Sequence, residues 1–179
     1  TASYMTPLEL KPGITATFHD AGHILGSASV LLEVKEGPRH QRLLFSGDLG
    51  ANGRPLLRDP ATPPHADVVV METTYGDRMH KRLQPSIAEL YAAIQDSFKR
   101  GGNVIIPTFA LERAQELLYC LREGVEQGQL PASMQVFLDS PMAISATEIF
   151  RRHPDCYEPE IRELFGNGGD PFALPGLHF

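Results

Sequence analysis

The sequence predicts an α/β protein made of two successive parts, a β-rich part followed by an α/β part. Three observations support this fold class. Short runs of β type fill residues 14–48, and a fourth follows at 66–74. From residue 85 onward, amphipathic helices alternate with apolar strands, which is typical of parallel βαβ units. The 179-residue length suits one ordinary domain or two small ones. We place the boundary near residues 78–86, which divides the chain into 1–82 and 83–179.

The β-rich part is expected to contain four strands. Residues 14–19 alternate between apolar and polar side chains, 27–34 are apolar and β-branched, and 42–48 form a third short run. Gly37 and Pro38 lie between the last two runs and predict a hairpin connection. Residues 66–74 are so continuously apolar that we expect a strand buried on both faces.

The α/β part is expected to contain three helices and two strands. A helix over residues 85–102 should begin with a capping box of Ser86 and Glu89 and end at Gly101. A buried strand at 103–110, a helix at 111–128 and a strand at 134–140 follow. The third helix should have Ser140 as its N-cap and Pro141 at its first position. The Gly- and Pro-rich residues 166–179 predict an irregular segment.

Composition narrows the class of protein. With 42% hydrophobic and 21% charged residues, the chain is typical of soluble globular proteins, and no apolar run is long enough to span a membrane. A cytoplasmic location is therefore the default. Cys120 and Cys156 lie 36 positions apart without a CxxC pattern, so neither a disulfide framework nor a cysteine zinc site is indicated. The net charge of −6 argues against a surface that coats nucleic acid, but allows local binding of phosphate through metal ions.

Three predicted strands are each followed by a possible metal ligand. His23, Asp48 and Glu72 lie in "HDAGH", "SGDLG" and "ETTYGD". Strand ends of α/β layers commonly collect functional groups at one edge of a sheet. Taken singly, Asp48 is equally well a turn residue and His23 a structural histidine. Histidine and aspartate together suit zinc, although a zinc site needs at least three protein ligands.

Five motifs in order resemble those of a known family. They are "DAGHILGSA", "LLFSGDLG", "VVVMETTYGDR", "GGNVIIPTFALERAQELLYCL" and "VFLDSPMAISATEIFRRH". Together they resemble the β-CASP branch of the metallo-β-lactamase superfamily, which contains RNA-processing nucleases. The resemblance implies that residues 1–82 are the C-terminal part of a metallo-β-lactamase-like αββα sandwich. It also implies that residues 83–179 are part of a β-CASP domain with a parallel sheet.

The resemblance also implies roles for single residues. His23 matches a ligand of one zinc ion, Asp48 a carboxylate that bridges two zinc ions, and Glu72 an acid that orients a histidine acting as general acid. His19 and Asp20 match no ligand position.

Three more residues lie near the start of the implied β-CASP domain, where an RNA phosphate backbone is expected. They are Thr108, Arg113 and Ser140. Helix capping or surface salt bridging is an equally good interpretation of each, and Arg113 has Glu116 and Glu112 within reach on its helix.

The sequence departs from the family pattern at both ends. The HxHxDH motif and the two C-terminal histidine motifs of the family are absent. We therefore expect an internal fragment that binds zinc weakly or not at all and is inactive alone.

For the intact protein, the resemblance implies zinc-dependent hydrolysis of RNA by an endonuclease or a 5′-exonuclease. The expected partner is the RNA substrate. No membrane association is expected, and a homodimer is one compatible oligomeric state. The alternatives are a non-catalytic β-CASP scaffold and a small-molecule metallo-hydrolase. The segment after residue 85 disfavours the latter.

Overall fold

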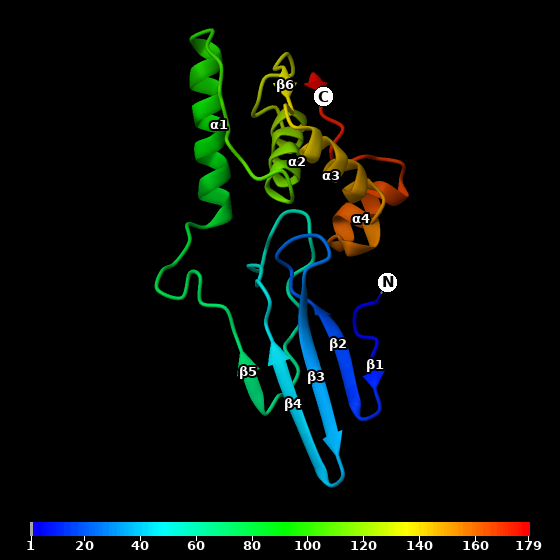
Figure 1. Cartoon of the computed structure of the whole chain (residues 1–179). Coiled ribbons are helices and arrows are strands. Elements are labelled where there is room, and N and C mark those ends of the chain that lie inside the picture. The colour runs from blue at the N-terminus through cyan, green and yellow to red at the C-terminus, as the bar shows by residue number, and fades with distance from the viewer. Residues whose placement is uncertain (1) are drawn as a thin grey trace. The chain divides into compact units, whose positions relative to one another are not determined.

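The structure is a computed structural model that describes residues 2–179 (Figure 1). It divides into two compact units, Thr1–Met79 and His80–Phe179. The sequence pattern placed the division after residue 82, a few residues later. Each unit is described by itself below. Every helix in residues 2–179 is too short or too polar to cross a membrane.

The first unit is built on one five-stranded sheet in the order β1-β2-β3-β4-β5. The first four strands pair antiparallel with their neighbours, whereas β5 pairs parallel with β4. The tight turn at Gly37, which has a φ of 55°, joins β3 to β4 as the expected hairpin. The strands are β1 Leu8–Lys11, β2 Ile14–Asp20, β3 Ala28–Glu36, β4 Arg39–Phe45 and β5 Val68–Val70.

Two features of this sheet differ from the sequence prediction. β1 was not expected, and β5 is exposed rather than buried, since Val68, Val69 and Val70 retain 45–57% of their accessible surface. β5 is an edge strand with a single neighbour, so an apolar run alone does not bring burial. The other three strands lie where the pattern predicts them.

The directions of the strands determine where their ends meet. β2 and β4 both run antiparallel to β3, and β5 runs parallel to β4. The C-terminal ends of β2, β4 and β5 therefore lie at the same end of the strands, which we call the sheet edge below. Figure 1 shows the loop after β2 and the chain leaving β4 at this end. These are the three strands that the chemically active motifs follow.

The second unit consists of four α-helices, one 3₁₀ helix and a two-stranded parallel sheet. One core cluster contains Tyr91, Ile94, Leu121 and Met134, and a second contains aromatic side chains around Phe150. The elements are α1 Leu83–Lys99, α2 Arg113–Glu126, β6 Val136–Phe137, α3 Pro141–Arg151, η1 Pro154–Cys156, α4 Pro159–Gly166 and β7 Leu177–His178.

The helix boundaries test the predicted caps. α3 begins as expected, because the Ser140 hydroxyl accepts the N–H of Ala143 at 3.2 Å and Pro141 occupies the first position. The predicted capping box of α1 is wrong. This helix begins at Leu83, two residues before the predicted start at residue 85, and the Ser86 hydroxyl donates instead to the carbonyl of Arg82. Gly101, with a φ of 66°, ends α1 as predicted.

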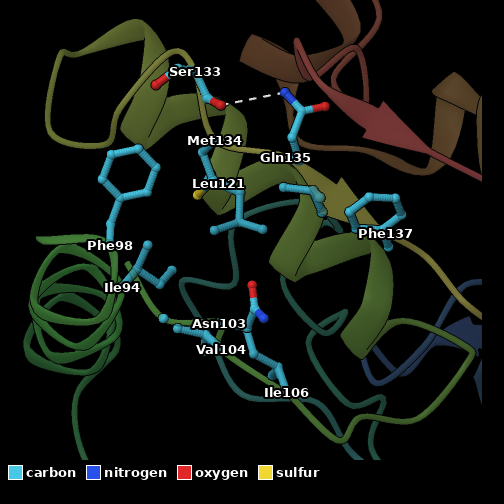
Figure 2. Close-up of a pocket in the computed structure, with 12 residues that line it drawn as sticks. Ile94, Phe98, Asn103, Val104, Ile106, Leu121, Ser133, Met134, Gln135 and Phe137 are labelled. Atoms are coloured by element: carbon cyan, nitrogen blue, oxygen red, sulfur yellow. Dashed lines mark hydrogen bonds between the residues drawn. The ribbon is translucent and has the colours of Figure 1, made fainter. Parts of the chain in front are cut away.

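The predicted strand at residues 103–110 is absent from the described structure, and this prediction is wrong. Val104, Ile105 and Ile106 are exposed, Ile105 by 91%. Val104 and Ile106 line an open cavity of about 470 Å³ together with Ile94 and Phe98 of α1 and residues around β6 (Figure 2). An apolar pattern indicates strand propensity, but a strand also requires a hydrogen-bonded neighbour.

The C-terminal part is more regular than its Gly and Pro content predicts. α4 was not expected, and Leu177 and His178 form β7 inside the segment interpreted as irregular. β7 pairs with β6 in parallel, so β6, α3 and β7 include a strand–helix–strand connection of the predicted kind.

Glu112 adopts a strained backbone conformation at the start of α2. Its φ is 67° and its ψ is −60°, and the N–H of Arg113 bonds to the carbonyl of Leu111 at 2.9 Å, which defines a γ-turn. A residue with a Cβ is disfavoured at such positive φ values, whereas glycine is not.

We expect Glu112→Gly to be more stable than Glu112→Ala by about 1 kcal/mol, since alanine keeps the strained backbone and glycine relieves it. Urea denaturation of the two variants measures the difference. The same pair at Glu123, inside α2, should show the reverse order, because glycine weakens a helix interior. An alanine variant at 112 as stable as the glycine variant would contradict the strain.

Candidate metal centre at the sheet edge

The loop after β2 is organised around the hydroxyl of Ser27. This hydroxyl accepts the N–H groups of His23 at 3.0 Å and Ile24 at 3.2 Å. The backbone of Ser27 closes the loop, because its N–H bonds to the carbonyl of Ile24 and its carbonyl accepts the N–H of Ala21. His23, which is half-buried, is therefore held on a closed turn.

The loop after β4 carries Asp48 and lies directly against the β2 loop. The N–H of Gly50 bonds to the carbonyl of Ala21 at 2.8 Å. A Cβ atom added at Gly50 would lie 1.8 Å from the carbonyl oxygen of Gly22 and 2.8 Å from the backbone nitrogen of His23. Only glycine allows this approach, so the sequence "GDLG" brings the Asp48 and His23 loops into backbone contact.

Glu72, which follows β5, joins the same edge. Its Oε1 atom accepts the N–H of Leu49, the residue after Asp48, at 2.7 Å. The N–H of Leu49 and the hydroxyl of Thr74 hold the pKa of the Glu72 carboxyl below its ordinary value. His23, Asp48 and Glu72 thus lie on neighbouring loops of one sheet edge.

The donor chemistry at this edge fits part of a metal site. An imidazole and a carboxylate are ligands that zinc accepts. No cluster of three or more histidine, cysteine or acidic side chains with metal-binding geometry occurs in residues 2–179. The described residues therefore supply fewer protein ligands than a complete zinc site requires.

Asp20 has a structural role in the same loop. Its Oδ1 accepts the N–H of Gly22 at 2.9 Å, and its Oδ2 lies 3.5 Å from the guanidinium of Arg58. His19 is buried in β2, and its two ring nitrogens have no hydrogen-bond partner within the part of the chain that the structure describes.

Thr108, Arg113 and Ser140 lie in the second unit, where two of them have structural partners. The guanidinium of Arg113 pairs with Glu116 at 2.5 Å, and Ser140 caps α3. Thr108 lies on the exposed segment before α2, and its hydroxyl is 3.5 Å from the carbonyl of Phe109. For Arg113 and Ser140 these are the structural alternatives that the sequence left open.

Sequence reasoning missed the residues that shape the edge. Ser27 and Gly50 carry the hydrogen bonds and the close contact described above, and the Ser46 hydroxyl accepts the N–H of Glu72, yet none of the three is a ligand or acid–base group. The motifs "GHILGS" and "SGDLG" contained them, and their small side chains between a glycine and a strand were the available signal.

We expect Gly50→Ala to separate the two loops, because the added methyl group meets backbone atoms that cannot rotate away. The variant should lose about 1–3 kcal/mol of stability. Amide NMR shifts of residues 21–27 should move, although the substitution lies in another loop.

Gly166→Ala is the matched control for Gly50→Ala, since nothing lies within 4 Å of the Cβ position there. It should leave both measurements unchanged. If residues 21–27 keep their shifts in Gly50→Ala, the two loops are not in the contact described.

Comparison with known proteins supports the resemblance found in the sequence. Residues 114–179 match the model of the Beta-Casp domain. The chain is 38% identical over 97% of its length to Ribonuclease TTHA0252 of Thermus thermophilus, of which it spans 40%. It is 34% identical over 94% of its length to Transcription termination factor FttA of Methanosarcina mazei, of which it spans 26%.

An RNase J-like protein of Methanocaldococcus jannaschii is 32% identical over 96% of the chain, which spans 40% of that protein. The chain thus spans less than half the length of each of these relatives. Residues 114–179 thus carry a Beta-Casp domain, and the mixed α/β architecture of the chain agrees with that of metallo-β-lactamase/β-CASP proteins. Members of this family are generally metal-dependent.

Proposed function

We propose that the whole protein to which these residues belong is a cytoplasmic, zinc-dependent ribonuclease that hydrolyses phosphodiester bonds in RNA. One observation carries the proposal: the loops of His23 and Asp48 touch through Gly50, and Glu72 bonds to the residue after Asp48. The names of two relatives, a ribonuclease and an RNase J-like protein, support the same reaction class.

In this proposal residues 1–82 are the C-terminal part of the metallo-β-lactamase-like domain, and residues 83–179 belong to the β-CASP domain. His23 would bind one metal ion and Asp48 would bridge two, with further ligands from other segments of the whole protein. When bound, a zinc pair supplies a water of near-neutral pKa and positive charge that stabilises a phosphate undergoing hydrolysis.

In this proposal the side chains of these residues hold the metal ions and orient the catalytic histidine. The Asp48 carboxylate is exposed, so it is accessible to ions and substrate. Glu72 keeps its carboxylate charged, because the N–H of Leu49 and the hydroxyl of Thr74 stabilise the anion. A charged Glu72 can accept a hydrogen bond from an imidazole and so orient a histidine as general acid.

Substrate contacts are the less constrained part of the proposal. Thr108 is exposed and adjoins α2, which makes its hydroxyl available to a phosphate. Arg113 and Ser140 already serve Glu116 and the α3 backbone, so contact with RNA would have to be compatible with those bonds.

The test uses the whole protein with end-labelled RNA and a DNA strand of the same sequence. We expect cleavage of the RNA, loss of cleavage after chelation, and recovery when zinc is restored. The product lengths distinguish internal cutting from trimming at the 5′ end. RNA that is bound but left uncut in the presence of zinc would favour a scaffold, and RNA cutting that survives chelation would exclude metal catalysis.

A further inference from the structure

Ser46 lies between the loops of the candidate metal centre, and no reactive role is assigned to it. It is the first residue after β4, and only 5% of its surface is accessible. A buried hydroxyl normally has specific hydrogen-bond partners, because burying it without them is unfavourable. Its partners therefore show what it holds in place.

The Ser46 hydroxyl connects two strand ends. It accepts the N–H of Glu72 at 3.0 Å and donates to the carbonyl of Gly47 at 2.7 Å. Gly47 has a φ of 58° and directly precedes Asp48. One hydroxyl thus fixes both the backbone of Glu72 and the backbone that leads into Asp48.

The Ser46 backbone is held from two further sides. Its N–H bonds to the carbonyl of Val70 in β5 at 2.9 Å, and its carbonyl accepts the hydroxyl of Ser29 at 2.6 Å. A Cβ atom at Gly47 would lie 2.7 Å from the carbonyl oxygen of Ala28, so this turn also packs closely on β3. With its own backbone fixed, the Ser46 side chain has little freedom to shift.

Together these bonds fix the distance between the backbones of Asp48 and Glu72. The Glu72 carboxylate in turn accepts the N–H of Leu49, on the far side of Asp48. Asp48 is therefore bracketed, with Ser46 fixing the residue before it and Glu72 fixing the residue after it. Removal of the Ser46 hydroxyl would free both the Gly47 carbonyl and the Glu72 N–H.

We propose that Ser46 is a positioning residue that sets Asp48 against Glu72 through its buried hydroxyl. The geometric part stands on the structure alone, whereas its consequence for catalysis rests on the proposed function. Groups that orient metal ligands typically change metal affinity or activity by about 10–100-fold when removed.

The geometric part is tested by amide hydrogen exchange on the 179-residue chain. In Ser46→Ala, the N–H groups of Glu72 and Leu49 should exchange about tenfold faster, as expected for the loss of one hydrogen bond. Ser46→Thr keeps the hydroxyl and should retain the wild-type rates. Ser27→Ala is the matched control, because it should speed exchange at His23 and leave Glu72 unchanged.

The catalytic part is tested in the whole protein with the same RNA. Ser46→Ala should lower kcat by about 10–100-fold, Ser46→Thr should restore it, and Ser133→Ala, at an exposed serine of the second unit, should leave it unchanged. The fall should be in kcat, since Ser46 is buried and does not contact substrate.

The outcomes separate the two claims. Unchanged exchange at Glu72 and Leu49 in Ser46→Ala, or a threonine variant as fast as the alanine variant, would overturn the positioning role. Normal cleavage by Ser46→Ala while Asp48→Ala is inactive would overturn the consequence for catalysis and leave the ribonuclease function intact. Cleavage that survives in Asp48→Ala would instead refute the proposed function. If Ser46→Ala does not fold, unprotected Glu72 and Leu49 amides in the wild-type chain would still overturn the proposal.

Discussion

Asp48→Ala is expected to reduce RNA cleavage by the whole protein by roughly 10³-fold or more. Metal ions contribute several kcal/mol to stabilising the charge that develops in phosphate hydrolysis, and each 1.4 kcal/mol changes a rate about tenfold. The proposed bridging carboxylate is the group through which this chain would share in that contribution. The measurement is the single-turnover cleavage rate at saturating zinc.

The control for this prediction is Glu36→Ala. Glu36 is an exposed acid at the C-terminal end of β3, next to the hairpin turn. Ala28 and Ser29, which contact the Asp48 loop, lie at the other end of the strand, so removal of the Glu36 carboxylate should not change the rate. Asp48 is itself exposed, so circular dichroism of Asp48→Ala should match that of the wild type. A correctly folded Asp48→Ala variant that cuts RNA at the wild-type rate would contradict the function proposed.

Phe150→Ala is expected to lower the free energy of unfolding of the second unit by about 3–5 kcal/mol. Phe150 is fully buried, its ring lies 6.3 Å from that of Phe172 and 6.4 Å from that of Tyr157, and its carbonyl accepts the Tyr157 hydroxyl at 2.7 Å. Such a loss is a large fraction of the stability of a typical domain.

Far-ultraviolet circular dichroism during urea denaturation measures this loss selectively, because the α-helices of the described chain all belong to the second unit. The matched control is Phe109→Ala, at a phenylalanine that is 81% exposed, and its unfolding midpoint should move little. Equal shifts for the two variants would mean that Phe150 does not occupy a packed core.

Sequence patterns predicted the parts of the fold that depend on neighbouring residues. The cap of α3 was predictable because Ser140 and Pro141 act within one turn of the helix. The absence of a strand at residues 103–110 and the exposure of β5 were not, since whether an apolar run is paired or covered depends on segments far away in the sequence. Ser86 matched a capping box, but the helix found an earlier start at Leu83.

The residues of the candidate site also fall into a predictable group and an unpredictable group. His23, Asp48 and Glu72 were identifiable because each follows an apolar run and carries a group with metal or acid–base chemistry. The hydroxyls of Ser27 and Ser46 were not, because serine is common in turns and only the three-dimensional contacts reveal its partners. The resemblance to β-CASP proteins supplied roles, whereas the structure supplied the bonds between the loops.

The contact between Gly22 and Gly50 also bears on motion. Because the two backbones touch and share the hydrogen bond from Gly50 to Ala21, the loops of His23 and Asp48 cannot fluctuate independently. Thermal displacement of one loop carries the other with it, so the separation of the two side chains varies less than the position of either loop. In the proposed metal site the two donors would therefore be preorganised, and less ordering entropy would be lost when an ion binds.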